Sequence, residues 1–70
     1  MKRETYFFIY CIERYRYYKK LSGADVAEIF AEHGIYDYVC RYFNVLHTMS
    51  DRNIVQDIDE YIQPGSIAAV

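Results

Sequence analysis

The sequence has few residues that crosslink or break a chain: its 70 residues include two cysteines, one proline and three glycines. Two cysteines can form only one disulfide, which excludes a disulfide-rich scaffold. We expect Cys11 and Cys40 to be reduced thiols that pack as small apolar side chains. No repeat or linker-like stretch precedes Gln-Pro-Gly at 63–65, and the chain is too short for separate catalytic and binding modules. We therefore predict one helical domain over residues 1–63 and a flexible tail over 64–70.

Long hydrophobic runs are also absent. The longest apolar run, residues 6–12, has seven residues, whereas a helix needs about 20 to cross a bilayer. The basic residues before this run resemble a secretion signal only in part, because Glu4 interrupts them and the charged segment 13–16 stands where a cleavage site needs small residues. We therefore predict a cytoplasmic protein with no membrane partner.

Charge is unevenly distributed along the chain. Residues 1–20 hold six basic and two acidic side chains, while the other fifty hold two basic and eight acidic ones, which gives a formal net charge of −2. Such a bipolar chain either pairs its two parts internally or presents each to a partner.

Apolar residues recur at helical spacing in four segments. The spacing predicts helices over 4–20, from Gly23 to Gly34, over 36–46, and from Ser50 to Pro64. We expect an all-α fold, a compact array of about four short helices in an orthogonal or small-bundle arrangement. The 4–20 helix is expected to be central. The predicted core positions include Phe8, Cys11, Ile12, Tyr15, Tyr18, Val26, Ile29, Phe30, Tyr38, Val39, Tyr42, Phe43, Leu46, Ile54, Ile58, Tyr61 and Ile62.

Five residues have the chemistry of helix termini. Ser22 and Ser50 are predicted N-caps, and Gly34 is expected to end the second helix in a left-handed conformation. His47 is expected to bond an unpaired carbonyl at the end of the third helix, and the Thr48 hydroxyl to support the following cap. A contact of His47 with a partner is the alternative.

Metal-binding and catalytic patterns are weak. Cys11, Cys40, His33 and His47 would suit zinc, but no two of them are closely spaced and Gly34 interrupts the helix that would align three of them. Cys40 and His47 lie about 10 Å apart along a helix, without a Gly-rich turn to hold an oxyanion. We therefore expect no enzymatic activity, no metal and no cofactor.

Acidic residues gather near the end of the fourth predicted helix, at Asp57, Asp59 and Glu60. On a helix Asp57 and Asp59 point about 200° apart, which argues against joint chelation of a cation. We interpret the cluster as solvated or facing a partner. Negative charge at a helix C-terminus opposes the helix dipole, so basic groups of the first helix or of a partner should compensate it.

Nine tyrosines are more than a core of this size can bury with every hydroxyl bonded. Tyrosine is favoured at protein interfaces, so we expect a protein-interaction module that binds another protein or a second copy of itself. The residues predicted to contact this partner are Tyr17, Tyr36, Asp57, Asp59, Glu60 and Tyr61.

Nucleic acid is the alternative partner, because residues 15–20 interleave aromatic and basic side chains. Against it, Tyr15 and Tyr18 are assigned to the core and the rest of the chain is acidic. A helix-turn-helix is disfavoured, because the segment 36–43 has one base, Arg41, beside the acid Asp37.

Several short strings together resemble a known family. They are Tyr-Cys-Ile-Glu at 10–13, Leu-Ser-Gly at 21–23, Phe30, Gly-Ile-Tyr-Asp-Tyr at 34–38, Leu-His-Thr at 46–48 and Asp-Ile-Asp-Glu-Tyr-Ile at 57–62. Over about residues 5–62 the chain resembles the bacterial "domain of unknown function" family numbered three-seven-nine-one, found mostly in Firmicutes. The resemblance implies a short helical protein, often encoded beside a larger protein that resembles ADP-ribosyltransferases. By analogy it implies an antitoxin or accessory subunit of that neighbour.

Overall fold

The computed structural model describes residues 2–63 and is all-α, as predicted. Within these residues five helices follow one another: α1 (Arg3–Lys19), α2 (Gly23–Glu32), α3 (Ile35–Arg41), α4 (Phe43–Leu46) and α5 (Asp51–Ile62). None of these helices is long and apolar enough to cross a membrane. The predicted tail, 64–70, lies outside the described residues.

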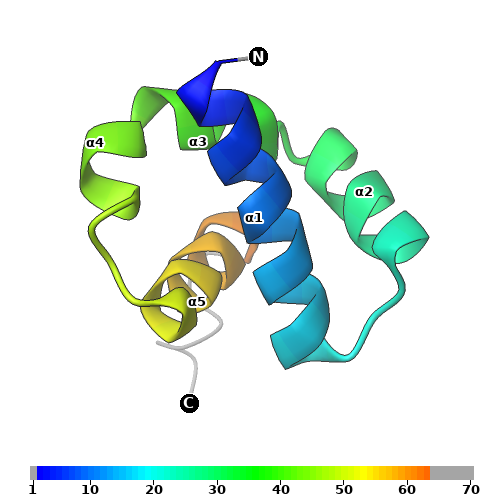
Figure 1. The fold of residues 1–70 in the computed structure, drawn as a ribbon. Coiled ribbons are helices and arrows are strands. Elements are labelled where there is room, and N and C mark those ends of the chain that lie inside the picture. The colour runs from blue at the N-terminus through cyan, green and yellow to red at the C-terminus, as the bar shows by residue number, and fades with distance from the viewer. Residues whose placement is uncertain (1, 64–70) are drawn as a thin grey trace.

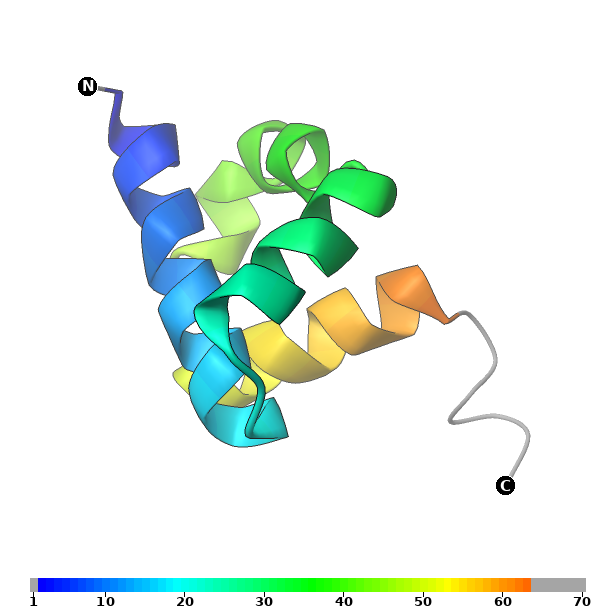
Figure 2. The same cartoon turned by 90° about the vertical axis from the view of Figure 1, so that its right-hand side faces the viewer.

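The longest helix, α1, lies along one side of the molecule. It packs against α2, α3 and α5, and Figures 1 and 2 show the other helices gathered on one side of it. Its inner face buries Cys11 and Tyr15, with Phe8 and Ile12 partly buried beside them. The predicted core position of Tyr18 is wrong: this residue lies in the last turn of α1 and is exposed, its ring packed edge-on against Tyr17 of the same helix.

Local chemistry fixes both ends of α2. The Ser22 hydroxyl accepts a hydrogen bond from the Asp25 backbone N–H at 3.1 Å, so the predicted cap is confirmed. Gly34 has a φ of 61°, the left-handed conformation that glycine adopts at low cost. The chain reverses there, and Ile35 joins Phe30 in the core.

The predicted helix over 36–46 is broken at Tyr42, which has a φ of −106° and a ψ of 19°. The break leaves α3 and the single turn α4. It turns Phe43 and Leu46 into the interior while Tyr42 remains exposed, so the predicted core position of Tyr42 is wrong. Tyr61, also expected in the core, is exposed too. Both rings leave the interior because smaller apolar side chains, Val39 and Ile58 among them, fill it.

Side chains bond the backbone between α4 and α5. His47 Nδ1 lies 2.7 Å from the Phe43 carbonyl oxygen, a carbonyl at the end of the third predicted helix. This carbonyl also accepts the His47 backbone N–H at 3.0 Å, so it is not the unpaired carbonyl that was expected. The Thr48 hydroxyl donates to the Val45 carbonyl at 2.7 Å instead of supporting the next cap, because the end of α4 leaves that carbonyl within reach. Ser50 caps α5 by accepting from the Asn53 N–H at 3.4 Å.

A single core lies where the helices meet. Its fully or nearly buried members come from all five helices, and α5 contributes three of them: Cys11, Tyr15, Val26, Phe30, Ile35, Val39, Leu46, Ile54, Val55 and Ile58. Two ion pairs join α1 to α5, Arg14–Asp51 at 3.4 Å and Lys19–Asp59 at 2.7 Å. The basic and acidic parts of the chain therefore pair internally at these points.

Candidate functional site

The acidic residues of α5 bond phenols on two opposite sides of the helix. Asp59 accepts a hydrogen bond from the Tyr15 hydroxyl at 2.5 Å and from Lys19 Nζ at 2.7 Å. Asp57 accepts one from the Tyr38 hydroxyl. Burial, followed by the bond to the carboxylate, raises the pKa of Tyr15 and of Tyr38 well above the ordinary tyrosine value. Both phenols are therefore neutral donors at physiological pH.

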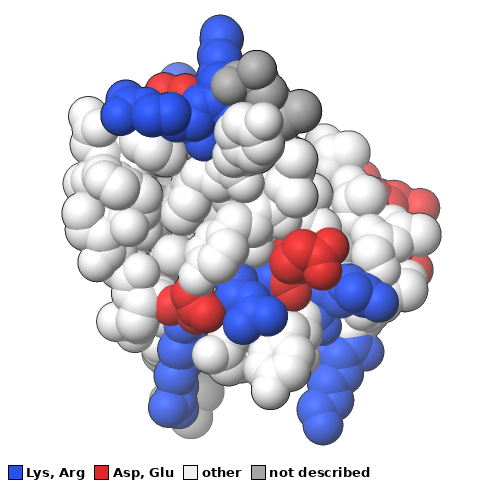
Figure 3. All heavy atoms as spheres, in the orientation of Figure 1, with Lys and Arg blue, Asp and Glu red and all other residues white. Residues whose placement is uncertain are grey.

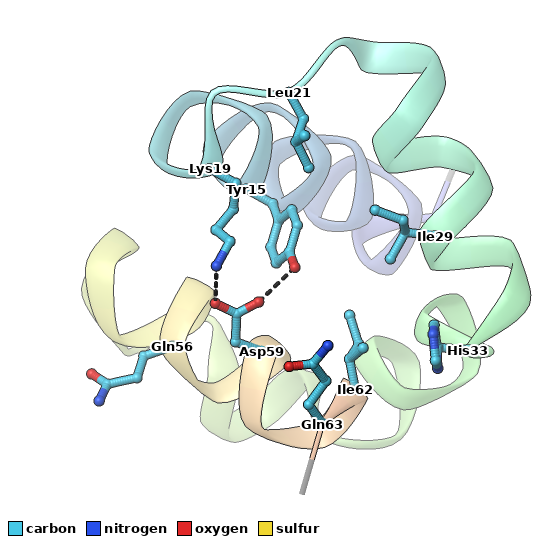
Figure 4. Close-up of a pocket in the computed structure, with 9 residues that line it drawn as sticks. All are labelled: Tyr15, Lys19, Leu21, Ile29, His33, Gln56, Asp59, Ile62 and Gln63. Carbon is cyan, nitrogen blue, oxygen red and sulfur yellow. Dashed lines mark hydrogen bonds and ion pairs between the residues drawn. The ribbon is translucent and has the colours of Figure 1, made fainter. Parts of the chain in front are cut away.

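The Asp59 side of α5 faces a groove between α1, α2 and α5. The cavity has a volume of about 610 Å³, and Figure 4 shows the Tyr15–Asp59–Lys19 cluster on one of its sides. Leu21, Ile29 and Ile62 give the groove apolar walls, and His33, Gln56 and Gln63 line the rest of it. Because Asp59 is already bonded to Tyr15 and Lys19, the polar centre of the groove is engaged in holding α1 against α5.

The Asp57 side of α5 faces a smaller cavity of about 300 Å³, lined mainly by tyrosine rings. The Tyr38 and Tyr61 rings stack with centroids 4.1 Å apart, and the Tyr42 ring lies 5.1 Å from that of Tyr38. Tyr42 and Tyr61 are each 46% exposed, so two large aromatic faces remain open to a partner. We call this cavity the tyrosine site and define it by its lining residues: Asp37, Tyr38, Arg41, Tyr42 and Tyr61.

The tyrosine site carries an excess of negative charge. Asp37 and Arg41 line the cavity four residues apart on α3, where opposite charges offset one another. Asp57 adds a carboxylate behind Tyr38. Two carboxylates therefore stand against one guanidinium, so the potential favours a positively charged group.

Three of the residues predicted to bind a partner belong to this region. Tyr61 lines the tyrosine site, Asp57 holds Tyr38 in place, and Glu60 is exposed next to Tyr61. Their contact with a partner stays a prediction.

The other three predicted partner residues lie elsewhere. Tyr17 is exposed on α1, with the Arg14 guanidinium 5.0 Å from its ring centroid. Tyr36 packs edge-on against Phe8, and its hydroxyl lies 3.0 Å from Thr5 Oγ1, so it joins α3 to α1. Asp59 lies in the groove. The structure therefore does not gather all six residues on one surface.

Sequence reasoning missed Tyr38 and Tyr42 as site residues, because their helical spacing placed both in the core. Tyrosines four residues apart on one helix are neighbours on its surface. The four-residue spacing of Tyr38 and Tyr42 fits either two core residues or two neighbouring rings on the surface. The exposure of Tyr42 shows that the second interpretation is right.

The potential metal ligands of the described residues are not grouped. Among residues 2–63 no three His, Cys, Asp or Glu side chains lie close enough to hold a metal ion. Cys11 and Cys40 are free thiols. Burial raises the pKa of Cys11 to about 12, which keeps that thiol protonated and unreactive at neutral pH.

Comparison with known proteins identifies the family. No curated protein and no solved structure matches the chain. The sequence pattern of one family, described as "Protein of unknown function (DUF3791)", matches residues 6–64. Since this match spans most of the chain, including all of the tyrosine site, the chain belongs to the DUF3791 family.

Proposed function

We propose that the chain is a helical protein-interaction module that binds a partner protein through the tyrosine site. One observation carries the proposal: the Tyr42 and Tyr61 rings both pack against Tyr38 in an open cavity, and these two rings are almost half exposed. Tyrosine supplies a large contact area and loses little conformational entropy on binding, because its ring is rigid. The fold does not need this exposure, since its core is complete without Tyr42 and Tyr61.

The charge of the tyrosine site specifies the partner's chemistry. A lysine or arginine side chain placed against Tyr42 or Tyr61 would meet the negative faces of the rings and the carboxylate of Asp37. The bond from the Tyr38 hydroxyl to Asp57 fixes the ring on which the other two pack. The partner therefore presents a basic side chain surrounded by apolar surface.

The family resemblance suggests which partner to test first. It implies a short protein that is often encoded beside a larger protein resembling ADP-ribosyltransferases. The proposed role is therefore an antitoxin or accessory subunit that binds this neighbour.

Binding between the two purified proteins tests the proposal. We expect isothermal titration calorimetry to show a complex, with affinity reduced at least tenfold by Tyr42→Ala combined with Tyr61→Ala, as for residues that dominate an interface. The matched control is Tyr6→Ala combined with Tyr10→Ala, which removes two exposed tyrosines of α1 and should leave the affinity unchanged. Circular dichroism of both variants checks that the fold is retained.

Two outcomes would contradict the proposal. Absence of binding by the unaltered chain would exclude this neighbour as the partner. Equal affinity of the unaltered chain and the Tyr42/Tyr61 variant would exclude the tyrosine site as the contact surface.

Nucleic acid is the second candidate partner, and the structure supplies observations for and against it. Tyr17 and Tyr18 are exposed, as stacking of nucleobases on their rings requires. However, three basic side chains in or next to this segment, Arg14, Arg16 and Lys19, already form ion pairs with carboxylates of the chain. Binding to phosphate would have to compete with those carboxylates, so we favour a protein partner.

A further inference from the structure

The groove between α1, α2 and α5 is an apolar surface that no described segment covers. Helix α1 packs on both α2 and α5, but α2 and α5 make few contacts with each other, so the space between them stays open. Leu21, Ile29 and Ile62 line this space and pack on the core, yet each remains partly exposed. The volume of about 610 Å³ lies in the range of cavities that hold ligands, about 300–1,000 Å³. The fold therefore leaves a binding groove beside the end of α5.

The charged groups of the groove satisfy one another. Lys19 Nζ lies 2.7 Å from one carboxylate oxygen of Asp59, and the other oxygen accepts a hydrogen bond from Tyr15 at 2.5 Å. An occupant therefore needs no charge of its own, and its apolar side chains would remove the apolar walls from water. Gln56 and Gln63 also line the groove, and their amide groups can donate to and accept from an occupant's backbone. The groove thus suits a short, uncharged, apolar peptide.

The chain itself supplies a peptide of this kind. The described residues end at Gln63, which lines the groove, and residues 64–70 follow it in the sequence. They read Pro-Gly-Ser-Ile-Ala-Ala-Val, with no charged side chain and four apolar residues in succession. From Gln63 to Ile67 an extended chain spans about 13 Å, more than the width of a helix, which is about 10–12 Å. Ile67 can therefore reach across the groove.

The sequence of this segment also favours a return toward the groove. Gln-Pro-Gly-Ser at 63–66 has proline at the second and glycine at the third of four positions, which is the pattern of a type II turn. A turn there would direct the following residues back along α5. Ile67 and Val70 are three residues apart, a spacing that puts both side chains on one side of a helical turn or of a polyproline II segment. Both side chains would then face the groove together.

A tethered segment has two advantages as the occupant. Its linkage to Gln63 gives it an effective concentration on the order of millimolar, so weak apolar contacts suffice. It also starts beside the groove. Figure 3 shows another broad area without charged residues, on the face of α1 that is turned away from the other helices, but Figure 2 shows the end of α5 on the opposite side of the molecule from that face. The groove is therefore the nearer of the two surfaces.

We propose that residues 66–70 dock in the groove, with the side chains of Ile67 and Val70 packed against its apolar walls. The docked segment would join α2 to α5, which make few direct contacts. This inference does not rest on the proposed function, because the tyrosine site lies on the other side of α5 and would stay open. The sequence alone predicts a flexible tail, and the groove gives that tail a binding surface.

Nuclear magnetic resonance of the full chain tests the docking. We expect nuclear Overhauser effects between the methyl groups of Ile67 and those of Ile29 or Ile62. Backbone order parameters over 66–70 should approach about 0.85, the value of rigid backbone. Absence of these methyl contacts, whatever the order parameters, would leave the groove to a separate molecule and overturn the proposal.

Two tail variants test which side chains hold the segment. In Ile67→Ser combined with Val70→Ser, the order parameters over 66–70 should fall below about 0.6, the range of flexible chain. The matched control, Ala68→Ser combined with Ala69→Ser, introduces the same two hydroxyls between these positions and should keep the values of the natural chain. If the two variants lose order equally, packing of Ile67 and Val70 does not hold the segment. Circular dichroism of both variants confirms that the helices are retained.

A mixture of ¹³C-labelled and unlabelled chains separates docking within one chain from exchange between two copies. We expect isotope-filtered spectra of the mixture to show no contact between Ile67 of one chain and Ile29 of another, while the contacts within the labelled chain persist. Contacts between labelled and unlabelled chains would assign the groove to a second copy and overturn the proposal.

Discussion

The bonds from Tyr15 and Lys19 to Asp59, and from Tyr38 to Asp57, explain how α5 holds acidic residues near its C-terminus. Negative charge there opposes the helix dipole at a cost of a few tenths to about 1 kcal/mol for each group. Hydrogen bonds to charged acceptors are stronger than those between neutral groups and offset this cost. The basic group that sequence reasoning expected from the first helix is Lys19.

Alkaline pH should destabilise the fold through these phenols and Cys11. Their pKa values are raised on folding, from 9.0 to about 12 for Cys11 and upward from 10.0 for Tyr15 and Tyr38. A group of this kind contributes stability that is fully present below its unfolded pKa and is lost as pH rises through its folded pKa. We therefore expect the free energy of unfolding, from urea titrations, to fall as pH rises above about 9.

A Tyr15→Phe variant provides the control for this pH dependence. It lacks one of the titrating phenols, so its free energy of unfolding should fall less steeply above about pH 10 than that of the natural chain. Identical slopes in the two proteins would show that the Tyr15 phenol does not contribute to the effect.

The two thiols should differ in reactivity. Cys11 is fully buried and protonated, whereas Cys40 is partly exposed. We expect Ellman's reagent to modify one thiol per folded chain and two in urea, and the fast reaction to disappear in Cys40→Ser. A fast reaction that persists in Cys40→Ser would mean that Cys11 is accessible.

At the scale of the helices, sequence reasoning located the starts and ends that depend on local chemistry. Ser22, Gly34 and Ser50 lie where they were predicted, because a side-chain oxygen or a glycine acts on its own backbone. The break at Tyr42 was not predicted, since no glycine or proline marks it. It results from the burial of Phe43 and Leu46, which only the assembled fold determines.

The candidate site was harder to predict from the sequence than the helices were. Tyr38 and Asp57 are 19 residues apart in the chain, and Tyr15 and Asp59 are 44 apart. Helical spacing predicted that Asp57 and Asp59 face opposite directions, which the structure confirms, but it could not predict which helix each one meets. The exposure of Tyr42 and Tyr61 also depends on how α3 and α5 pack.

Gly34 should be the glycine whose replacement weakens the fold. Alanine at Gly34 must adopt a φ near 61°, which strains the backbone of any residue with a Cβ atom. The added methyl meets no atom within 4 Å, so strain is the only cost. We expect Gly34→Ala to lower the free energy of unfolding by about 1 kcal/mol. Gly23→Ala is the matched control. Gly23 begins α2, and its added methyl approaches only the Arg16 side chain at 4.0 Å, so stability should stay equal or rise slightly. Thermal unfolding of both variants checks this, and equal losses would contradict the assignment.

At the scale of the whole molecule, the fold neutralises part of the charge of the chain and leaves the rest at one place. Internal ion pairs engage Arg14 and Lys19, and an acidic excess remains at the tyrosine site between α3 and α5. The proposed protein partner would therefore meet open aromatic rings and uncompensated negative charge on the same surface. Because the partner would bind only the folded chain, its binding would also stabilise a core that is small for an independent domain.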